Sequence, residues 1–269
     1  MQIITLENDN NIIEGENVDY SKSKIDFKGE GNILFLEGDL SLGNSNIDFK
    51  GNNSIVFLRS TNAEYRLKIS IFHDSVIYFG LNSTVFCRKK LKSLVLNAYE
   101  RKNIFIGNDV MFSHGIRITT SDAHLIYSTK TLERKNYSKS IFIGDHVWIG
   151  REATLLKGTQ IFSGSIIGSN SLVSGKIIKS NTSWAGNPAK LISEDVFWVR
   201  PNVNKLTEEE SNEYDTCLDS EPFIFKHEPE VYLPFDMIDK HLKKCNTAEK
   251  KCAYLIKISS IESHNRFAF

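Results

Sequence analysis

A six-residue repeat over residues 143–173 constrains the fold of this 269-residue chain more than any other feature. Steps of six from the first of these positions meet only aliphatic residues: Ile143, Ile149, Leu155, Ile161, Ile167 and Val173. Four places after each comes a residue that is mostly small or β-branched: Val147, Ala153, Thr159, Ser165, Ser171 and Ile177. A period of six matches neither the 3.6 of a helix nor the 2.0 of a simple strand. It predicts a three-sided prism, the β-helix solenoid, in which each hexapeptide forms one side and points its aliphatic residue inward.

The same phase appears upstream of a polar stretch. Ile106-Gly107, Val110, Phe112 and Ile118 fit the repeat, and residues 120–140 do not. Since coils are expected on both sides of residues 120–140, this stretch is predicted to be a loop extruded from a continuing prism, not a domain boundary.

Looser repeats precede the prism. The segments IDFKGEGNILFLEG, from Ile25, and IDFKGNNSIVFLRS, from Ile47, begin 22 residues apart, and LKISIFHDSVIYFG, from Leu67, is a further variant. Their apolar alternation and their Gly and Asn turns indicate short strands. We therefore expect residues 1–103 to form irregular coils that cap the solenoid, which would otherwise end in an open sheet edge.

The composition changes after Ile192. The segment LTEEESNEY (206–214) has a threonine suited to cap a helix, followed by acidic residues. The segment PFDMIDKHLKKC (234–245) begins with proline and places Phe235, Ile238, Leu242 and Cys245 at helical spacing. Residues 193–269 are thus expected to be a mostly helical tail whose aromatic residues pack on the prism or on a neighbouring subunit, beside a repeat core at 104–192.

Bulk properties exclude several classes of function. The formal net charge is zero, which does not favour a nucleic-acid partner. No apolar run approaches the roughly 18 residues of a membrane span, and the N-terminal sequence does not resemble a signal peptide. The four cysteines (Cys87, Cys217, Cys245 and Cys252) have no metal-ligand spacing. A cytoplasmic protein without a metal is expected.

The extruded loop is where chemistry is expected, because loops on a rigid scaffold often carry function. It opens with Thr119-Thr120-Ser121-Asp122-Ala123-His124. A histidine can accept and return a proton near neutral pH, and Asp122 is close enough to orient His124 or its loop. His114 is the rival base, and His146 is expected to be structural.

A family resemblance adds to these inferences. The segments TTSDAH, IFIGDHVWIGREATLLKGTQI, SIIGSNSLVSGKI and SWAGNPAKLI resemble the hexapeptide-repeat acyltransferases, in the branch of the galactoside, maltose and bacterial polysaccharide O-acetyltransferases. The resemblance covers residues 104–192. It implies a left-handed parallel β-helix, a homotrimer and acetyl-CoA as co-substrate.

The resemblance also implies the reacting groups. The catalytic histidine of the family falls on His124 and its tryptophan on Trp148, 24 positions later. His124 would take the proton of an acceptor hydroxyl, while backbone N–H groups and the Trp148 indole stabilise the developing negative charge.

Coenzyme A would lie in a groove between two subunits. The positions that match coenzyme A contacts in the family are Arg151, Ser169, Ser174, Gly175 and Lys190. Many relatives have a small residue in place of Arg151 and Thr-Lys in place of Ser174-Gly175, and Lys176 could substitute for that lysine. Cations are needed here because coenzyme A carries several phosphate charges.

The function expected is acetyl-CoA-dependent O-acetylation of a sugar hydroxyl in a bacterial surface glycan, either a capsule or lipopolysaccharide. The basic residues of the loop (Lys130, Arg134, Lys135 and Lys139) could attract an acidic glycan that contains sialic acid, although such residues more often form a solvated surface. Two alternatives stay open: N-acetylation of a nucleotide-linked amino sugar, and a β-helix scaffold without activity.

Overall fold

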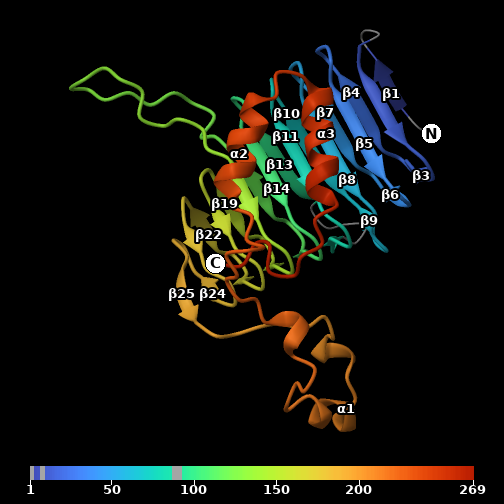
Figure 1. Ribbon diagram of the computed structural model, residues 1–269, viewed down its shortest axis with the longest axis vertical. Helices are drawn as coiled ribbons and strands as arrows, with labels where there is room; N and C mark the ends of the chain where they lie inside the picture. The colour runs from blue at the N-terminus through green and yellow to red at the C-terminus, as the bar shows by residue number, and fades with distance from the viewer. Residues whose placement is uncertain (1–2, 7–9, 87–92) are drawn as a thin grey trace.

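The computed structural model describes residues 3–6, 10–86 and 93–269, and Cys87 lies outside them. Successive strands lie on the three sides of a prism in turn, so strands three places apart in the chain pair in parallel (Figure 1). The first side, sheet A, contains β1 (Ile3–Leu6), β4 (Lys24–Phe27), β7 (Asn46–Phe49), β10 (Leu67–Ile71), β13 (Leu94–Ala98), β16 (Arg117–Thr119), β19 (Thr154–Leu156) and β22 (Leu172–Ser174).

The other two sides follow the same rule. Sheet B contains β2 (Ile12–Gly15), β5 (Ile33–Glu37), β8 (Ile55–Arg59), β11 (Val76–Phe79), β14 (Asn103–Ile106), β17 (Ile141–Ile143), β20 (Gln160–Ile161) and β23 (Ile177–Ile178). The third side begins as sheet C, with β3 (Val18–Asp19), β6 (Leu40–Leu42) and β9 (Glu64–Tyr65). It continues as sheet D, with β12 (Thr84–Val85), β15 (Met111–Phe112), β18 (Trp148–Ile149), β21 (Ile166–Ile167), β24 (Ser183–Ala185) and β25 (Lys190–Ser193), the last strand being antiparallel to its neighbour.

Three corners join these sides in each coil. We call the turn from sheet A to sheet B the AB corner, the turn from sheet B to sheet D the BD corner, and the turn from sheet D back to sheet A the DA corner. Each corner is a column of turns stacked from coil to coil, because the strands on either side pair in register.

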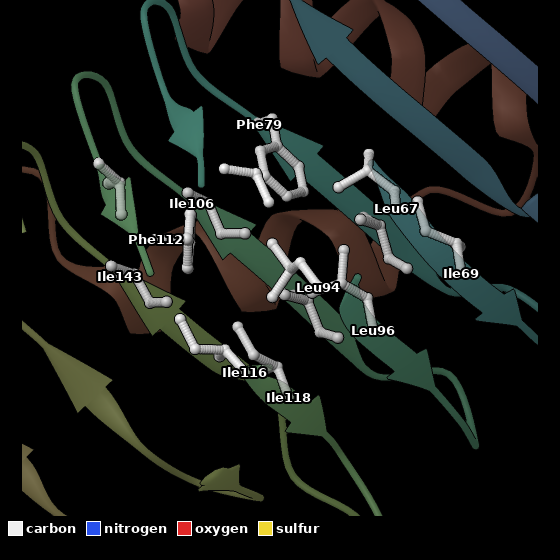
Figure 2. Packing of buried hydrophobic residues seen from close by; sticks show 14 of the residues in the cluster. Leu67, Ile69, Phe79, Leu94, Leu96, Ile106, Phe112, Ile116, Ile118 and Ile143 are labelled. Atoms are coloured by element: carbon white, nitrogen blue, oxygen red, sulfur yellow. The ribbon is translucent and has the colours of Figure 1, made fainter. Parts of the chain in front are cut away.

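The six-residue phase predicted for the core is confirmed. Ile143, Ile149, Leu155, Ile161, Ile167 and Val173 lie on β17 to β22 in turn, and all are fully buried. The small residues at the alternate position are buried too, except for Ile177, which is 58% exposed. The next aliphatic position, opposite Ile161, is taken by Ile178 and not by Lys179. The phase therefore slips by one residue in the last coil. Figure 2 shows the interior side chains of neighbouring coils stacked against one another.

The 22-residue repeat in the N-terminal part is also the pairing register. Ile25 pairs with Ile47 and Ile33 with Ile55. Identical side chains then stack on themselves: the rings of Phe27 and Phe49 lie 4.5 Å apart and 13° from parallel. Sheets A and B continue without a break from these coils into the hexapeptide coils.

The segment between β16 and β17 projects away from the coils as a long two-limbed loop (Figure 1). The backbone bonds that join its limbs include Lys135 N–H to Ile126 O, 2.8 Å, and Ser128 N–H to Glu133 O, 2.9 Å. Its tip and flanks expose large side chains: Leu125, Ile126, Tyr127, Leu132 and Tyr137.

The C-terminal residues are partly helical. They contain the 3₁₀ turns η1 (Val203–Lys205) and η2 (Glu221–Phe223) and the helices α1 (Glu208–Glu213), α2 (Phe235–Lys244) and α3 (Ala248–Ser259). Thr207 caps α1 as predicted, in a reciprocal capping box with Glu210. The predicted second helix is α2, which buries Phe235, Ile238 and Leu242. Helix α3 was not predicted.

Helices α2 and α3 cover the outer face of sheet B. The ring of Phe142 on β17 stacks on Phe235 of α2, with centroids 5.2 Å apart, and Phe105 on β14 meets the edge of Phe267 at 5.6 Å. These aromatic rows therefore lie in a second core outside the prism. No helix in the described part of the chain is long and apolar enough to span a membrane.

Candidate active site

The root of the extruded loop is closed by one buried amide. Asn136, only 7% exposed, donates from Nδ2 to the carbonyl oxygen of His124 (2.6 Å) and to Oδ2 of Asp122 (3.1 Å). Its Oδ1 accepts from the backbone N–H of Ile126 (2.9 Å). Asn136 thereby ties the outgoing limb to the returning one at the position of the predicted base.

Asp122 anchors this root to the prism. Its carboxylate accepts from Lys157, which follows β19 at the AB corner, and the hydrogen bond from Lys157 lowers the pKa of Asp122 below its usual value. The sequence left open whether Asp122 orients the imidazole or the loop. The side-chain bonds described for Asp122 go to Lys157 and Asn136, so it holds the loop.

His124 itself is exposed. Its backbone N–H donates to the carbonyl oxygen of Asp122, 2.8 Å away, across Ala123, whose φ is +68°. The tight turn and the bond from Asn136 fix the backbone of His124 beside the AB corner while its imidazole stays accessible. An accessible imidazole on a fixed backbone can accept a proton from a hydroxyl brought within hydrogen-bond distance.

A second clamp holds the returning limb. The guanidinium of Arg134 forms a bidentate pair with Glu100 (2.7 and 2.8 Å), and the hydroxyl of Ser138 donates to the same carboxylate at 2.5 Å. The bonds from Arg134 and Ser138 lower the pKa of Glu100 to about 2. Arg134, treated as part of a basic loop in the sequence, therefore serves mainly to hold the loop to the coil that precedes it.

Trp148 lies elsewhere on the prism. It is the first residue of β18, next to the BD corner, and is half-buried because the following Ile149 takes the interior position. Its indole N–H points to Oγ of Ser113 at 3.5 Å, a weak bond, and its ring centroid is 6.1 Å from that of Trp198.

One side of the prism separates His124 from Trp148. A side of about five extended residues is about 16 Å long, longer than either side chain can reach. The AB and BD corners of one chain therefore do not bring the two residues together.

The predicted coenzyme A residues divide in the same way. Ser174, Gly175 and Lys176 are exposed and lie at the AB corner, one coil beyond Lys157. Arg151 and Ser169 are exposed at the DA corner, on successive coils, and Lys190 is exposed on β25. The exposed cations Arg151 and Lys176 thus lie at different corners of one chain, the DA and the AB corner.

The two other histidines have different surroundings. His114 is half-buried at the DA corner, where its carbonyl oxygen accepts from Glu152 N–H at 2.9 Å. His146, at the BD corner, is buried, and its Nδ1 lies 2.6 Å from Asp109 and its Nε2 3.0 Å from the carbonyl oxygen of Trp198. The structural role expected for His146 agrees with this environment.

His146 holds the C-terminal extension against the prism. Its ring stacks on Trp198 with centroids 4.2 Å apart and planes 7° from parallel, and the Trp198 indole donates back to the His146 carbonyl at 3.0 Å. Burial raises the pKa of Asp109, but hydrogen bonds from His146 and Arg200 outweigh it, and the net pKa lies below the usual value. The aromatic residues of the extension were expected to pack on the prism or on a neighbouring subunit, but His146 was not identified as the residue that Trp198 contacts.

Among the residues that the structure describes, no cluster of three or more His, Cys, Asp or Glu side chains could hold a metal ion. The residues that the sequence did not identify at the site are Asn136, Lys157 and Glu100. They carry no motif, since their role depends on the folded loop bringing positions 12 to 38 residues apart into contact.

Comparison with known proteins places this geometry in a family, although no protein-family model matches the chain. A polysialic acid O-acetyltransferase of Neisseria meningitidis is 32% identical over 199 residues, which cover 74% of this chain and 80% of that protein. The solved structure of the polysialic acid O-acetyltransferase OatWY matches with a TM-score of 0.66 and 28% identity, over 78% of this chain and 96% of that one.

A second solved structure, that of the polySia-specific acetyltransferase NeuO, matches with a TM-score of 0.67 and 26% identity, over 80% of this chain and 96% of that one. The match extends well beyond residues 104–192, to which the sequence motifs are confined. Together with the coiled parallel sheets and the hexapeptide phase, these similarities show that the chain belongs to the hexapeptide-repeat acetyltransferases, in the branch of the bacterial polysaccharide O-acetyltransferases.

Proposed function

We propose that this protein transfers an acetyl group from acetyl-CoA to a hydroxyl of an acidic, sialic-acid-containing capsular glycan. The similarity to polysialic acid O-acetyltransferases supports the substrate class. The observation that carries the proposal is the exposed imidazole of His124 on a backbone fixed by Asn136, at the same corner as Ser174, Gly175 and Lys176. We place the reaction in the cytoplasm, where acetyl-CoA is available.

When bound, acetyl-CoA supplies the acetyl group as an activated thioester. His124 accepts the proton of the acceptor hydroxyl while that oxygen forms its bond to the acetyl carbon, and it returns the proton to the departing sulfur. A positioned base of this kind contributes about 10²–10⁴ to the rate. Backbone N–H groups and the indole of Trp148 stabilise the negative charge that develops on the carbonyl oxygen.

The proposed assembly is a homotrimer of left-handed prisms with coenzyme A between neighbouring copies. Two features support it. His124 and Trp148 lie at opposite ends of one side, and the cations Arg151 and Lys176 lie at different corners, so a neighbouring copy is needed to bring each pair together. The exposed apolar side chains of the loop, Leu125, Ile126 and Leu132 among them, provide a surface for that neighbour.

The repeat core, the N-terminal coils and the C-terminal extension are proposed to have different roles. Residues 104–192 carry the reaction, with the loop 120–140 walling the site. Residues 1–103 extend the prism, and residues 193–269 cover sheet B and the BD corner.

The test measures coenzyme A release from acetyl-CoA with a panel of capsular saccharides. Polysialic acid should support turnover, and His124→Ala should reduce it by about 10²–10⁴ with little change in coenzyme A affinity or melting temperature. His114→Ala is the control and should remain active. Normal turnover of His124→Ala, with loss of activity in His114→Ala, would mean that the base has been misassigned.

A further inference from the structure

Four side chains form a row along the AB corner before the loop. Lys28, Lys50, Phe72 and Tyr99 directly follow β4, β7, β10 and β13, whose last residues pair in register. The backbone ladder continues through this row, since Lys28 N–H donates to Phe49 O and Lys50 N–H to Ile71 O, each at 2.8 Å. We call these four residues the corner row; at about 4.8 Å per strand, it is about 14 Å long.

The members of the corner row point outward, and the last three contact one another in order. The residue before each of them, such as Phe49 or Ile71, is buried in the prism, and alternate residues of a strand point to opposite faces. Nζ of Lys50 lies 5.7 Å from the centre of the Phe72 ring, and the rings of Phe72 and Tyr99 lie 4.7 Å apart. Lys28 and Lys50 are exposed and the two rings half-buried, so the row presents cations and then aromatic surface.

The corner row leads directly into the catalytic loop. Tyr99 N–H donates to Oγ1 of Thr120, 2.8 Å away, and Thr120 is four residues before His124. Tyr99 is also adjacent to Glu100, the carboxylate that holds the returning limb. The aromatic end of the row therefore lies at the loop root.

The positions of the proposed coenzyme A residues indicate from which side of His124 each substrate approaches. Ser174, Gly175 and Lys176 lie on the coils after the loop, at the same corner. In direct transfer the acceptor must reach His124 from the side that coenzyme A does not occupy. The coils before the loop, which carry the corner row, are that side.

The charges of the row suit an anionic polymer. Among the residues that the structure describes, Lys28 and Lys50 form no ion pair with a carboxylate. Asp26 and Asp48, two residues before Lys28 and Lys50 on the same strands, have other partners: Asp26 pairs with Lys24 (3.2 Å) and Asp48 accepts a hydrogen bond from Asn46 (2.9 Å). Exposed Lys68 and Arg117 add positive charge on sheet A.

We propose that the corner row binds the acidic glycan acceptor as an extended chain several sugars long, with carboxylates at Lys28 and Lys50 and sugar rings against Phe72 and Tyr99. A chain held in this way presents one of its hydroxyls at His124. This inference rests on the proposed function, because it takes His124 as the base and the later coils as the coenzyme A side.

The test compares acceptors of different length on the full-length protein. Lys28→Ala/Lys50→Ala should raise KM for long polysialic acid about tenfold, and should leave KM for a sialic acid trimer, KM for acetyl-CoA and kcat within twofold. The increase should disappear at high salt, which screens exposed charges. Phe72→Leu should raise KM for the long polymer at low and high salt alike, since its contact is apolar. Lys205→Ala/Lys244→Ala removes two exposed lysines elsewhere and should change nothing.

An unchanged KM for the long polymer, or an equal increase for trimer and polymer, would overturn the corner row as a binding site while leaving the proposed function intact. Direct titration of long polysialic acid without acetyl-CoA separates the remaining case. If the wild-type protein binds the polymer, the double lysine variant does not, and neither acetylates it, the binding site stands and the proposed function fails.

Discussion

Nδ2 of Asn136 lies 2.6 Å from the carbonyl oxygen of His124, and the same amide group bonds Asp122. This contact joins two limbs of a loop at the residue proposed to move the proton. The amide is buried, whereas the imidazole it positions is exposed. Hydrogen bonds thus hold the backbone at the base of the loop, while the imidazole of His124 is accessible.

Asn136→Ala should lower kcat by about tenfold or more. The change removes the side chain that bonds the His124 carbonyl oxygen and the Ile126 N–H, so the backbone that carries the imidazole is held less firmly. A hydrogen bond contributes a net of about 0.5–1.5 kcal/mol, and 1.4 kcal/mol corresponds to a factor of ten. The prism does not depend on this bond, so the melting temperature should fall by only a few degrees. Steady-state kinetics and thermal melting check both; Lys135→Ala, an exposed neighbour, is the control. A loss of stability equal to the loss of activity would contradict a positioning role.

Acid should weaken the loop clamp only at unusually low pH. Because the pKa of Glu100 is lowered to about 2, its contribution to stability is complete above the usual glutamate pKa, about 4.3, and is lost as the pH falls toward 2. The difference in melting temperature between wild type and Glu100→Gln should therefore be constant from pH 7 to about pH 5 and shrink below about pH 4. A difference that persists unchanged at pH 2.5 would show that the carboxylate charge is not responsible.

Trp198→Ala should destabilise the protein by about 3–5 kcal/mol, the usual cost of truncating a buried aromatic side chain. The variant loses the stack on His146 and the indole bond to its carbonyl oxygen. Urea denaturation measures the change, and Val203→Ala, which alters a 78% exposed residue in the same segment, should be neutral. Equal stability of the two variants would mean that Trp198 does not latch the extension.

Lys190→Glu should weaken coenzyme A binding about three- to tenfold at low salt, because an exposed attraction to phosphate becomes a repulsion. Salt should reduce the difference. Lys179→Glu, the same reversal at another exposed lysine, should leave the affinity unchanged. Calorimetric titration at two ionic strengths decides the matter, and a salt-independent affinity equal to that of wild type would remove Lys190 from the phosphate contacts.

The prism was predictable because its period is imposed on every residue of the repeat. Ile143, Ile149 and Leu155 had to face inward once the six-residue phase was recognised, and they do. The last coil is one residue shorter than the repeat, so that Ile178 and not Lys179 lies opposite Ile161, and the aliphatic phase of the preceding coils did not predict this. Helix α3 escaped notice because its buried residues include Lys251, a type that patterning assigns to the surface.

The site was predictable only at its motif positions. His124 and Asp122 stand out in the sequence, but their supports, Asn136 and Lys157, come close only when the loop returns to the coil. The partner of Trp198 was hidden for the same reason: His146 precedes it by 52 residues, and the stack joins a turn of the prism to the extension.

Because the N-terminal coils pair in register, the length of this part of the molecule depends on the number of coils. Each 22-residue coil adds one step of about 4.8 Å to every column of side chains on its surface, and it adds nothing to the width. Removing or duplicating one such coil would shift the point where a polymer first contacts the protein by one strand spacing relative to His124. The reaction at His124 itself would not change. The number of coils would then set the polymer length beyond which a longer acceptor gains no further affinity.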